Sequence, residues 1–251
     1  ELLTAERTYY VNPTGSDSAS GSTEATAFAT LAKAEAVVTG TLDLGGFNVT
    51  IRLADGTYTA GVTLRKLTGS GNAILEGNEI TPGNVVIDVS TGSAIRAEGA
   101  GSDWQVRNFR VNAGAGGSGL DARNGAWLRH SGIVFGVCGV AHISLSAGSR
   151  ANCTGSYTIA GAAPVHVRQY AGSTYTHNGT SIAVSAAVTF SSSFLYSSGG
   201  FCTFKAYTLT GSAVSGKRYT LELLALLDAG GTSASFPGST AGTTATGAQV
   251  A

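Results

Sequence analysis

Short runs in which apolar and polar residues alternate cover most of this chain from Val49 onward. Val49, Ile51 and Leu53 form the first such run, and Ala54-Asp55-Gly56 follows it as a turn. Alternation with a period of two is typical of a β-strand that has one buried face. The pattern therefore predicts many short strands joined by tight turns.

A glycine recurs beside these runs at a nearly constant spacing of about 24 positions, which lies within the range of stacked repeat folds. The recurring glycines are Gly77, Gly101, Gly125, Gly148 and Gly172. Because strands fill this period, we predict an all-β fold, a right-handed parallel β-helix with roughly seven coils between Val49 and Leu209. A propeller needs about twice this period per blade, and a β-sandwich does not explain a fixed spacing.

The two ends of the chain differ from this repeat. A strand is expected at Thr8–Val11, and a short helix over 26–38 begins at Thr26 and carries apolar residues at helical spacing. We expect this helix to cap the open end of the solenoid. The apolar run Tyr219–Leu227 either packs on the last coil or meets a second chain. The predicted parts are therefore 1–48, 49–218 and 219–251.

Composition excludes several classes of protein. No apolar run approaches the ~18 residues of a membrane span, and the bases are not clustered as in nucleic-acid-binding proteins. Cys138, Cys153 and Cys202 lack metal-ligand spacing, so we expect buried free thiols, no metal and no cofactor. The chain contains no methionine and opens on Glu1, which suggests a piece of a longer product.

Charge is distributed unevenly although the net charge is zero. Residues 122–221 contain no Asp or Glu, and they hold all the histidines and several arginines. His142 and His166 are one predicted coil apart, and Arg150 and Arg168 lie nearby in the repeat. Such a row of bases creates a positive field that attracts anionic polymers. We therefore predict that these four residues contact acidic polysaccharide, with a solvated polar column as the alternative.

Two further pairs are candidates for glycan chemistry. Trp104 and Trp127 are also about one coil apart, so they either stack on sugar rings or fill the core. Glu79 and Asp103 occupy the same place relative to their repeat glycines. Glycoside hydrolysis uses two carboxyl groups about 5 to 9.5 Å apart, which adjacent coils could supply. Solvated turn residues are the alternative for this weak catalytic pair.

Two segments resemble known proteins. Tyr10-Val11-Asn12 through Gly15, Asp17 and Gly21, Phe28–Leu31 with Lys33-Ala34, and Ile51–Tyr58 resemble the entry motif and first coil of pectate-lyase-like β-helix proteins. Ala27 stands where that motif often has Pro. The closing stretch resembles the C-terminal end of many bacteriophage tail proteins; it comprises Leu226-Leu227-Asp228, Gly230-Gly231, Phe236–Ser239, Ala241-Gly242-Thr243 and Thr246-Gly247.

The resemblance implies a homotrimer, attachment to a phage tail or baseplate, and contact with bacterial surface polysaccharide. It also implies an extracellular location on the virion tail, and it assigns no fixed catalytic residues. Our interpretation is a tail-spike or tail-fibre segment that recognises polysaccharide without catalysis, because the later coils lack carboxylates. The alternatives are a polysaccharide depolymerase, either hydrolase or lyase, on the same β-helix, and a secreted bacterial β-helix lyase or adhesin.

Overall fold

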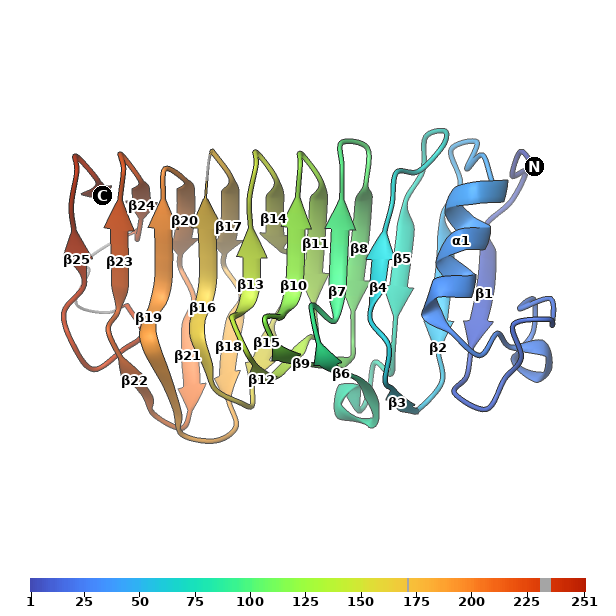
Figure 1. The fold of residues 1–251 in the computed structure, drawn as a ribbon, viewed down its shortest axis with the longest axis horizontal. Helices are drawn as coiled ribbons and strands as arrows, with labels where there is room; N and C mark the ends of the chain where they lie inside the picture. Colours follow the sequence, from blue (N-terminus) through green and yellow to red (C-terminus); the bar gives the residue numbers. More distant parts are fainter. Residues whose placement is uncertain (171, 231–235) are drawn as a thin grey trace.

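The chain forms a parallel β-solenoid of about eight turns with one α-helix near its N-terminus (Figure 1). The computed structural model describes residues 1–170, 172–230 and 236–251. Every strand pairs in parallel with its equivalent on the next turn, within one of three sheets. The predicted all-β parallel solenoid is thereby confirmed.

The strands divide among sheets that we call sheet 1, sheet 2 and sheet 3. Sheet 1 contains β1 (Arg7–Val11), β2 (Val49–Leu53), β5 (Ala73–Glu76), β8 (Asp103–Arg107), β11 (Trp127–Ser131), β14 (Arg150–Cys153), β17 (Thr174–Asn178), β20 (Phe201–Lys205), β24 (Leu226–Asp228) and β26 (Gln249–Val250). Sheet 2 contains β4 (Val62–Leu64), β7 (Ile95–Glu98), β10 (Ser118–Arg123), β13 (Ala141–Leu145), β16 (Ala163–Tyr170), β19 (Val188–Ser198), β22 (Val214–Gly216), β23 (Tyr219–Glu222) and β25 (Thr243–Thr244). Sheet 3 contains β3 (Gly56–Tyr58), β6 (Val85–Thr91), β9 (Arg110–Ala115), β12 (Val134–Cys138), β15 (Tyr157–Ile159), β18 (Ser181–Val184) and β21 (Thr208–Gly211).

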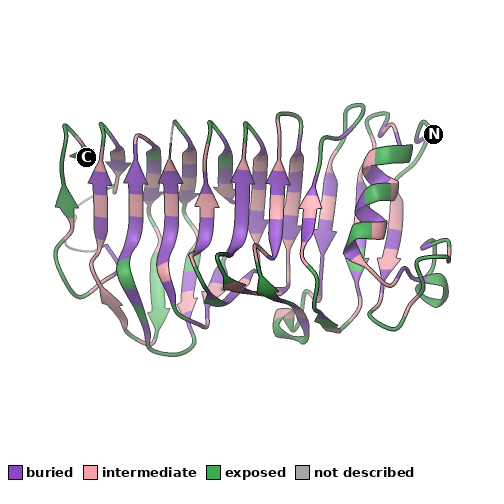
Figure 2. Ribbon diagram, viewed as in Figure 1, coloured by how far each residue is buried: buried purple, intermediate pink, exposed green. Residues whose placement is uncertain are grey.

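Inward-facing side chains form one continuous core along the solenoid axis. Leu120 pairs with Ile95 on one side and Ile143 on the other, and all three are fully buried. Figure 2 shows the same distribution throughout, with buried residues along the strands and exposed residues at the turns. Burial of stacked apolar side chains is the main force that holds coils of this kind together.

The turn from sheet 2 to sheet 1 explains the glycine period. Gly101, Gly125, Gly148 and Gly172 all lie there with positive φ, from 70° to 87°, a region that glycine enters without steric cost. Gly77 does not belong to this column. Its coil makes an extra excursion around η2 (Pro82–Asn84), so Arg107 pairs with Glu76 at a separation of 31 positions.

The N-terminal helix begins later than the sequence predicts. α1 spans Leu31–Thr41, and the side chain of its N-cap residue Thr30 accepts a hydrogen bond from the Lys33 amide at 3.1 Å. Thr26 instead ends the short 3-10 helix η1 (Glu24–Thr26), where its hydroxyl accepts from the Thr23 amide. α1 packs against β1, β2 and β4. Its role as a cap stays a prediction.

Strand pairing continues beyond both ends of residues 49–218, the range predicted for the solenoid. β1 pairs with β2, and β23 to β26 extend sheets 1 and 2 to the C-terminus. Within the apolar C-terminal run, Leu221 and Leu227 are buried in the last coils, whereas Leu223 and Leu224 are exposed at a turn. Gly231, part of the C-terminal motif, lies outside the described residues.

Candidate functional site

The four predicted basic residues do not share one face. Arg150 lies on β14 of sheet 1 and Arg168 on β16 of sheet 2, whereas His142 and His166 are fully buried. The prediction that all four line one polysaccharide-binding surface is therefore wrong. The stacking of His142 and His166 one coil apart is correct, but their rings face the core.

The two histidines satisfy each other's hydrogen-bonding groups inside the solenoid. Their Nδ1 atoms are 2.9 Å apart, His142 Nε2 is 3.1 Å from the Gly136 carbonyl, and Tyr157 Oη is 2.8 Å from His166 Nε2. A carbonyl only accepts, so His142 carries its proton on Nε2 and accepts at Nδ1. His166 then donates from Nδ1 and accepts from Tyr157 at Nε2. All these contacts are satisfied with both rings neutral, which makes burial inexpensive.

The chain of hydrogen bonds continues toward sheet 1. The Tyr175 side chain interacts with that of Tyr157, and His130 Nε2 lies 3.3 Å from Tyr175 Oη. His177 is buried in the same core, with Nε2 2.7 Å from the Thr180 hydroxyl. All the histidines of the protein thus lie in one aromatic core.

Burial lowers the pKa of every histidine in this core. Desolvation moves the pKa of His130 and of His142 from 6.5 to about 3, and that of His177 to about 4. Desolvation, with the neighbouring histidines as smaller causes, also lowers the pKa of His166 well below its ordinary value. No histidine is therefore charged at neutral pH, and none contributes to a positive surface field.

Arg168 lies in a surface groove over sheet 2. The groove has a volume of about 430 Å3 and is lined by Gly139, Val140, Pro164, Val165, Arg168, Tyr170, Ser192 and Tyr196. The Arg168 guanidinium carbon is 4.7 Å from the centre of the Tyr170 ring, and Nε donates to Tyr170 Oη at 2.9 Å. The Tyr170 and Tyr196 rings are 5.5 Å apart. The groove thus combines a cation, two aromatic rings and an apolar wall.

No carboxylate neutralises Arg168 within the part of the chain that the structure describes. Asp121 lies two strands away in the same register row, where Arg96 and Arg123 pair with it. On the other side, Glu222 accepts a hydrogen bond from Tyr196 Oη at 2.9 Å. Sequence analysis named Arg168 but missed both tyrosines. Arg168 and Tyr196 are register partners on adjacent strands. The coil from β16 to β19 is longer than the repeat period, so a constant period does not predict this pairing.

The two tryptophans occupy different environments. Trp104 is fully buried, and its Nε1 donates to the Arg65 carbonyl at 2.9 Å. The prediction that it binds glycan is therefore wrong, and the alternative, that it fills the core, is correct. Trp127 lies half-buried on the outer side of sheet 1, in register with Asp103 and Arg150. Strand alternation separates the two residues, because Trp104 pairs with Leu128 rather than with Trp127.

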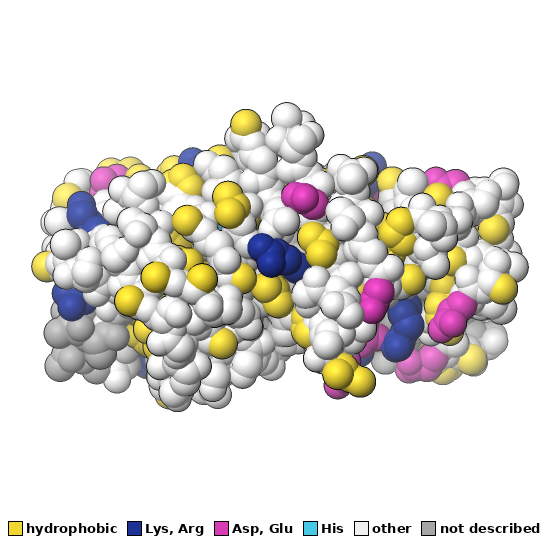
Figure 3. Space-filling view, turned by 90° about the horizontal axis from the view of Figure 1, so that it is seen from below, with side chains coloured by type: hydrophobic (Ala, Val, Ile, Leu, Met, Phe, Trp, Pro, Cys, Tyr) yellow, Lys and Arg dark blue, Asp and Glu magenta, His cyan; other side chains and the backbone are white. Residues whose placement is uncertain are grey.

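The predicted catalytic pair is not formed. Asp103 makes an ion pair with Arg129 at 2.7 Å. Its neighbour Trp104 pairs with Ala73 at the start of β5, so the strand register does not bring Asp103 beside Glu79. The extra residues around η2 shift Glu79 out of the expected position. Glu79 instead lines a separate pocket of about 410 Å3 near the N-terminus, together with Glu24, Asp55 and Glu76. In Figure 3, acidic side chains gather over this N-terminal half.

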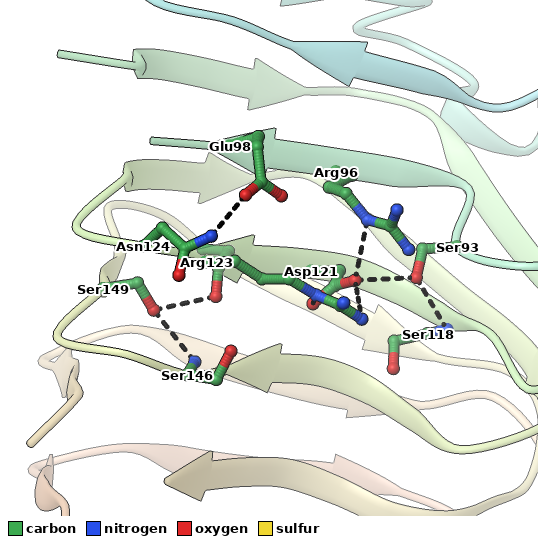
Figure 4. A network of polar contacts seen from close by, with 10 residues as sticks. Ser93, Arg96, Glu98, Ser118, Asp121, Arg123, Asn124, Ser146 and Ser149 are labelled. Carbon is green, nitrogen blue, oxygen red and sulfur yellow. Dashed lines mark hydrogen bonds and ion pairs between the residues drawn. The ribbon is translucent and has the colours of Figure 1, made fainter. Parts of the chain in front are cut away.

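The carboxylates inside the solenoid wall are paired. Asp121 on sheet 2 is 1% exposed; it accepts hydrogen bonds from Ser93 Oγ at 3.0 Å and Arg96 Nε at 3.2 Å, and both its oxygens contact Arg123 (Figure 4). Glu76 is held in the same way by two arginines. These ion pairs and hydrogen bonds stabilise the buried carboxylates.

Among residues 1–170, 172–230 and 236–251, no group of His, Cys, Asp and Glu has a metal-binding arrangement. All three cysteines are free and buried, as expected, and burial raises the pKa of Cys138 to about 12. The described part of the chain has no helix long and apolar enough to cross a membrane. No protein-family model matches the chain, and neither the curated proteins nor the solved structures include a significant match.

Proposed function

We propose that this chain recognises an acidic bacterial surface polysaccharide through the Arg168 groove. The observation that carries the proposal is an Arg168 guanidinium that has no carboxylate partner among the described residues and is stacked on Tyr170 beside Tyr196. Arginine binds carboxylate and phosphate groups bidentately, and aromatic rings present apolar faces to ligands while their hydroxyls bond polar groups. These are the contacts that an acidic sugar requires.

The biological setting rests on the sequence resemblance. On that basis the chain is a right-handed parallel β-helix of a phage tail spike or tail fibre, located outside the cell on the virion tail. It would assemble as a homotrimer, with attachment to the tail or baseplate. Light scattering at micromolar concentration tests the assembly, and a monomer would refute the trimer.

The groove is tested with Arg168→Ala in a binding assay against purified capsule and lipopolysaccharide fragments. Loss of a charge-assisted contact of about 1.5 kcal/mol predicts roughly tenfold weaker binding. Arg110→Ala is the matched control, because Arg110 is a half-buried arginine on sheet 3. Equal affinities for wild type and Arg168→Ala, or equal losses in both variants, would contradict the proposal.

A depolymerase is the second candidate, and the N-terminal pocket is the observation that favours it. Glu24 and Glu79 line this pocket and are exposed, and neither forms an ion pair within the described residues. Incubation with the same polysaccharides, followed by sizing of the products, distinguishes a depolymerase from a protein that only binds. Shortened chains that disappear with Glu79→Gln would favour hydrolysis or elimination over binding alone.

A further inference from the structure

A second group of aromatic and basic side chains lies on the outer side of sheet 1. Trp127, Arg150, Thr174 and Phe201 are register partners on the consecutive strands β11, β14, β17 and β20. Neighbouring strands are about 4.8 Å apart, so the two aromatic residues are separated by about 14 Å along the axis. Arg150 and Thr174 fill the space between them.

Both aromatic side chains present carbon to solvent. Phe201, the first residue of β20, is 39% exposed. Trp127 is half-buried, and its Nε1 atom is buried without an acceptor among the described residues. The solvent-facing part of this side chain is therefore ring carbon.

The Trp127 ring is held in place by its neighbour on the same strand. The Arg129 guanidinium lies 5.3 Å from the ring centre, and Asp103 fixes that guanidinium through a 2.7 Å ion pair. Asn72 Oδ1 accepts a second hydrogen bond from Arg129 at 3.2 Å. A ring fixed before binding loses little entropy when a ligand stacks on it.

Arg150 gives this surface an uncompensated positive charge. It is exposed and has no ion pair within the described part of the chain. The acids at the two ends of the face are engaged, Asp103 by Arg129 and Asp228 by Lys205. The adjacent row on the same side consists of Asn152, Thr176 and Thr203, which offer amide and hydroxyl groups.

We propose that the face from Trp127 to Phe201 is a second binding surface for acidic polysaccharide, running along the solenoid axis. Sugar rings stack on Trp127 and Phe201, and Arg150 binds an anionic group between them. The inference rests on the proposed function at Arg168, but it concerns a different sheet. One chain thus engages two segments of a polymer, and linked weak sites of this kind increase overall avidity.

Calorimetry with acidic oligosaccharides tests the second surface, using oligogalacturonate, hyaluronan fragments and oligosialic acid as probes and dextran oligosaccharide as the neutral control. We expect two sites per wild-type chain and one in Arg168→Ala. Adding Trp127→Ala and Phe201→Ala to Arg168→Ala should weaken the remaining site by about tenfold or more. Adding Leu209→Ala instead should leave it unchanged, because Leu209 is similarly exposed, at 38%, but lies on sheet 3.

The outcomes separate the two proposals. A single site that Arg168→Ala abolishes would overturn the second surface and leave the groove intact. Absence of binding to every probe would overturn both. If the Trp127 and Phe201 substitutions alter the oligomeric state in light scattering but not oligosaccharide binding, this face is an interface between chains, and the inference fails.

Discussion

Acidification to pH 5 should destabilise this protein strongly, because its histidines are buried in neutral form. The pKa of His130 and of His142 falls to about 3 in the folded chain, and that of His177 to about 4. In the unfolded chain the pKa returns to 6.5. The unfolded state therefore binds more protons as pH falls below 6.5, and folding stability decreases from that point toward the folded-state pKa values.

The size of the effect follows from linkage. A histidine that stays neutral when folded loses about 2 kcal/mol of stabilisation between pH 7.5 and pH 5. The four histidines together predict a loss of about 8 kcal/mol, with a slope near 5 kcal/mol per pH unit around pH 5. Typical domains have a free energy of unfolding of about 5 to 15 kcal/mol, so this loss approaches the total.

Urea denaturation followed by tryptophan fluorescence at several pH values measures this slope. The double change His142→Phe with His166→Phe should halve the slope, because two of the titrating groups are removed. Absolute stability should fall as well, since Tyr157 loses its acceptor, so the slope is the diagnostic quantity. A free energy of unfolding that is constant from pH 7.5 to pH 5 would refute the neutral buried core.

Substitutions in the turns and in the buried ion network should also have distinct costs in urea denaturation. Gly148→Ala should cost about 1 kcal/mol, because only its positive φ opposes a side chain; a loss of several kcal/mol would contradict this. Gly117→Ala should cost clearly more, since its Cβ would lie 1.7 Å from a backbone oxygen of the neighbouring coil. Removing Arg96 and Arg123 together should cost about 3 kcal/mol or more, because Asp121 then keeps only the hydrogen bond from Ser93. Asp121→Asn should cost less, since both arginines are partly exposed and can turn to water; equal costs would refute this asymmetry.

The architecture was predictable because its cause is local and periodic. Alternating apolar residues specify strands, and a turn that requires positive φ selects glycine at Gly101, Gly125, Gly148 and Gly172. Leu224, with φ of 61°, occupies the equivalent turn in the last coils without glycine. The sequence also predicted three buried thiols correctly, because a cysteine without ligand partners packs as a small apolar side chain.

The candidate site was only partly predictable, because a constant period does not say which way a side chain points. His142 and His166 are one coil apart, as the sequence indicated, but hydrogen bonds to Tyr157 and the Gly136 carbonyl allow both to be buried. The extra residues around η2 separated Glu79 from Asp103. A longer coil likewise concealed the partnership of Arg168 and Tyr196.

The sequence by itself determined that this chain winds into stacked β-coils with glycine at one turn and no acid between residues 122 and 221. Only the tertiary structure decided which bases reach the surface. Arg150 and Arg168 lie on different sheets, and the histidines lie in the core. The physical reason is that repeat spacing fixes which residues are neighbours along the axis. Orientation depends on bends between sheets and on hydrogen-bond partners contributed by other coils.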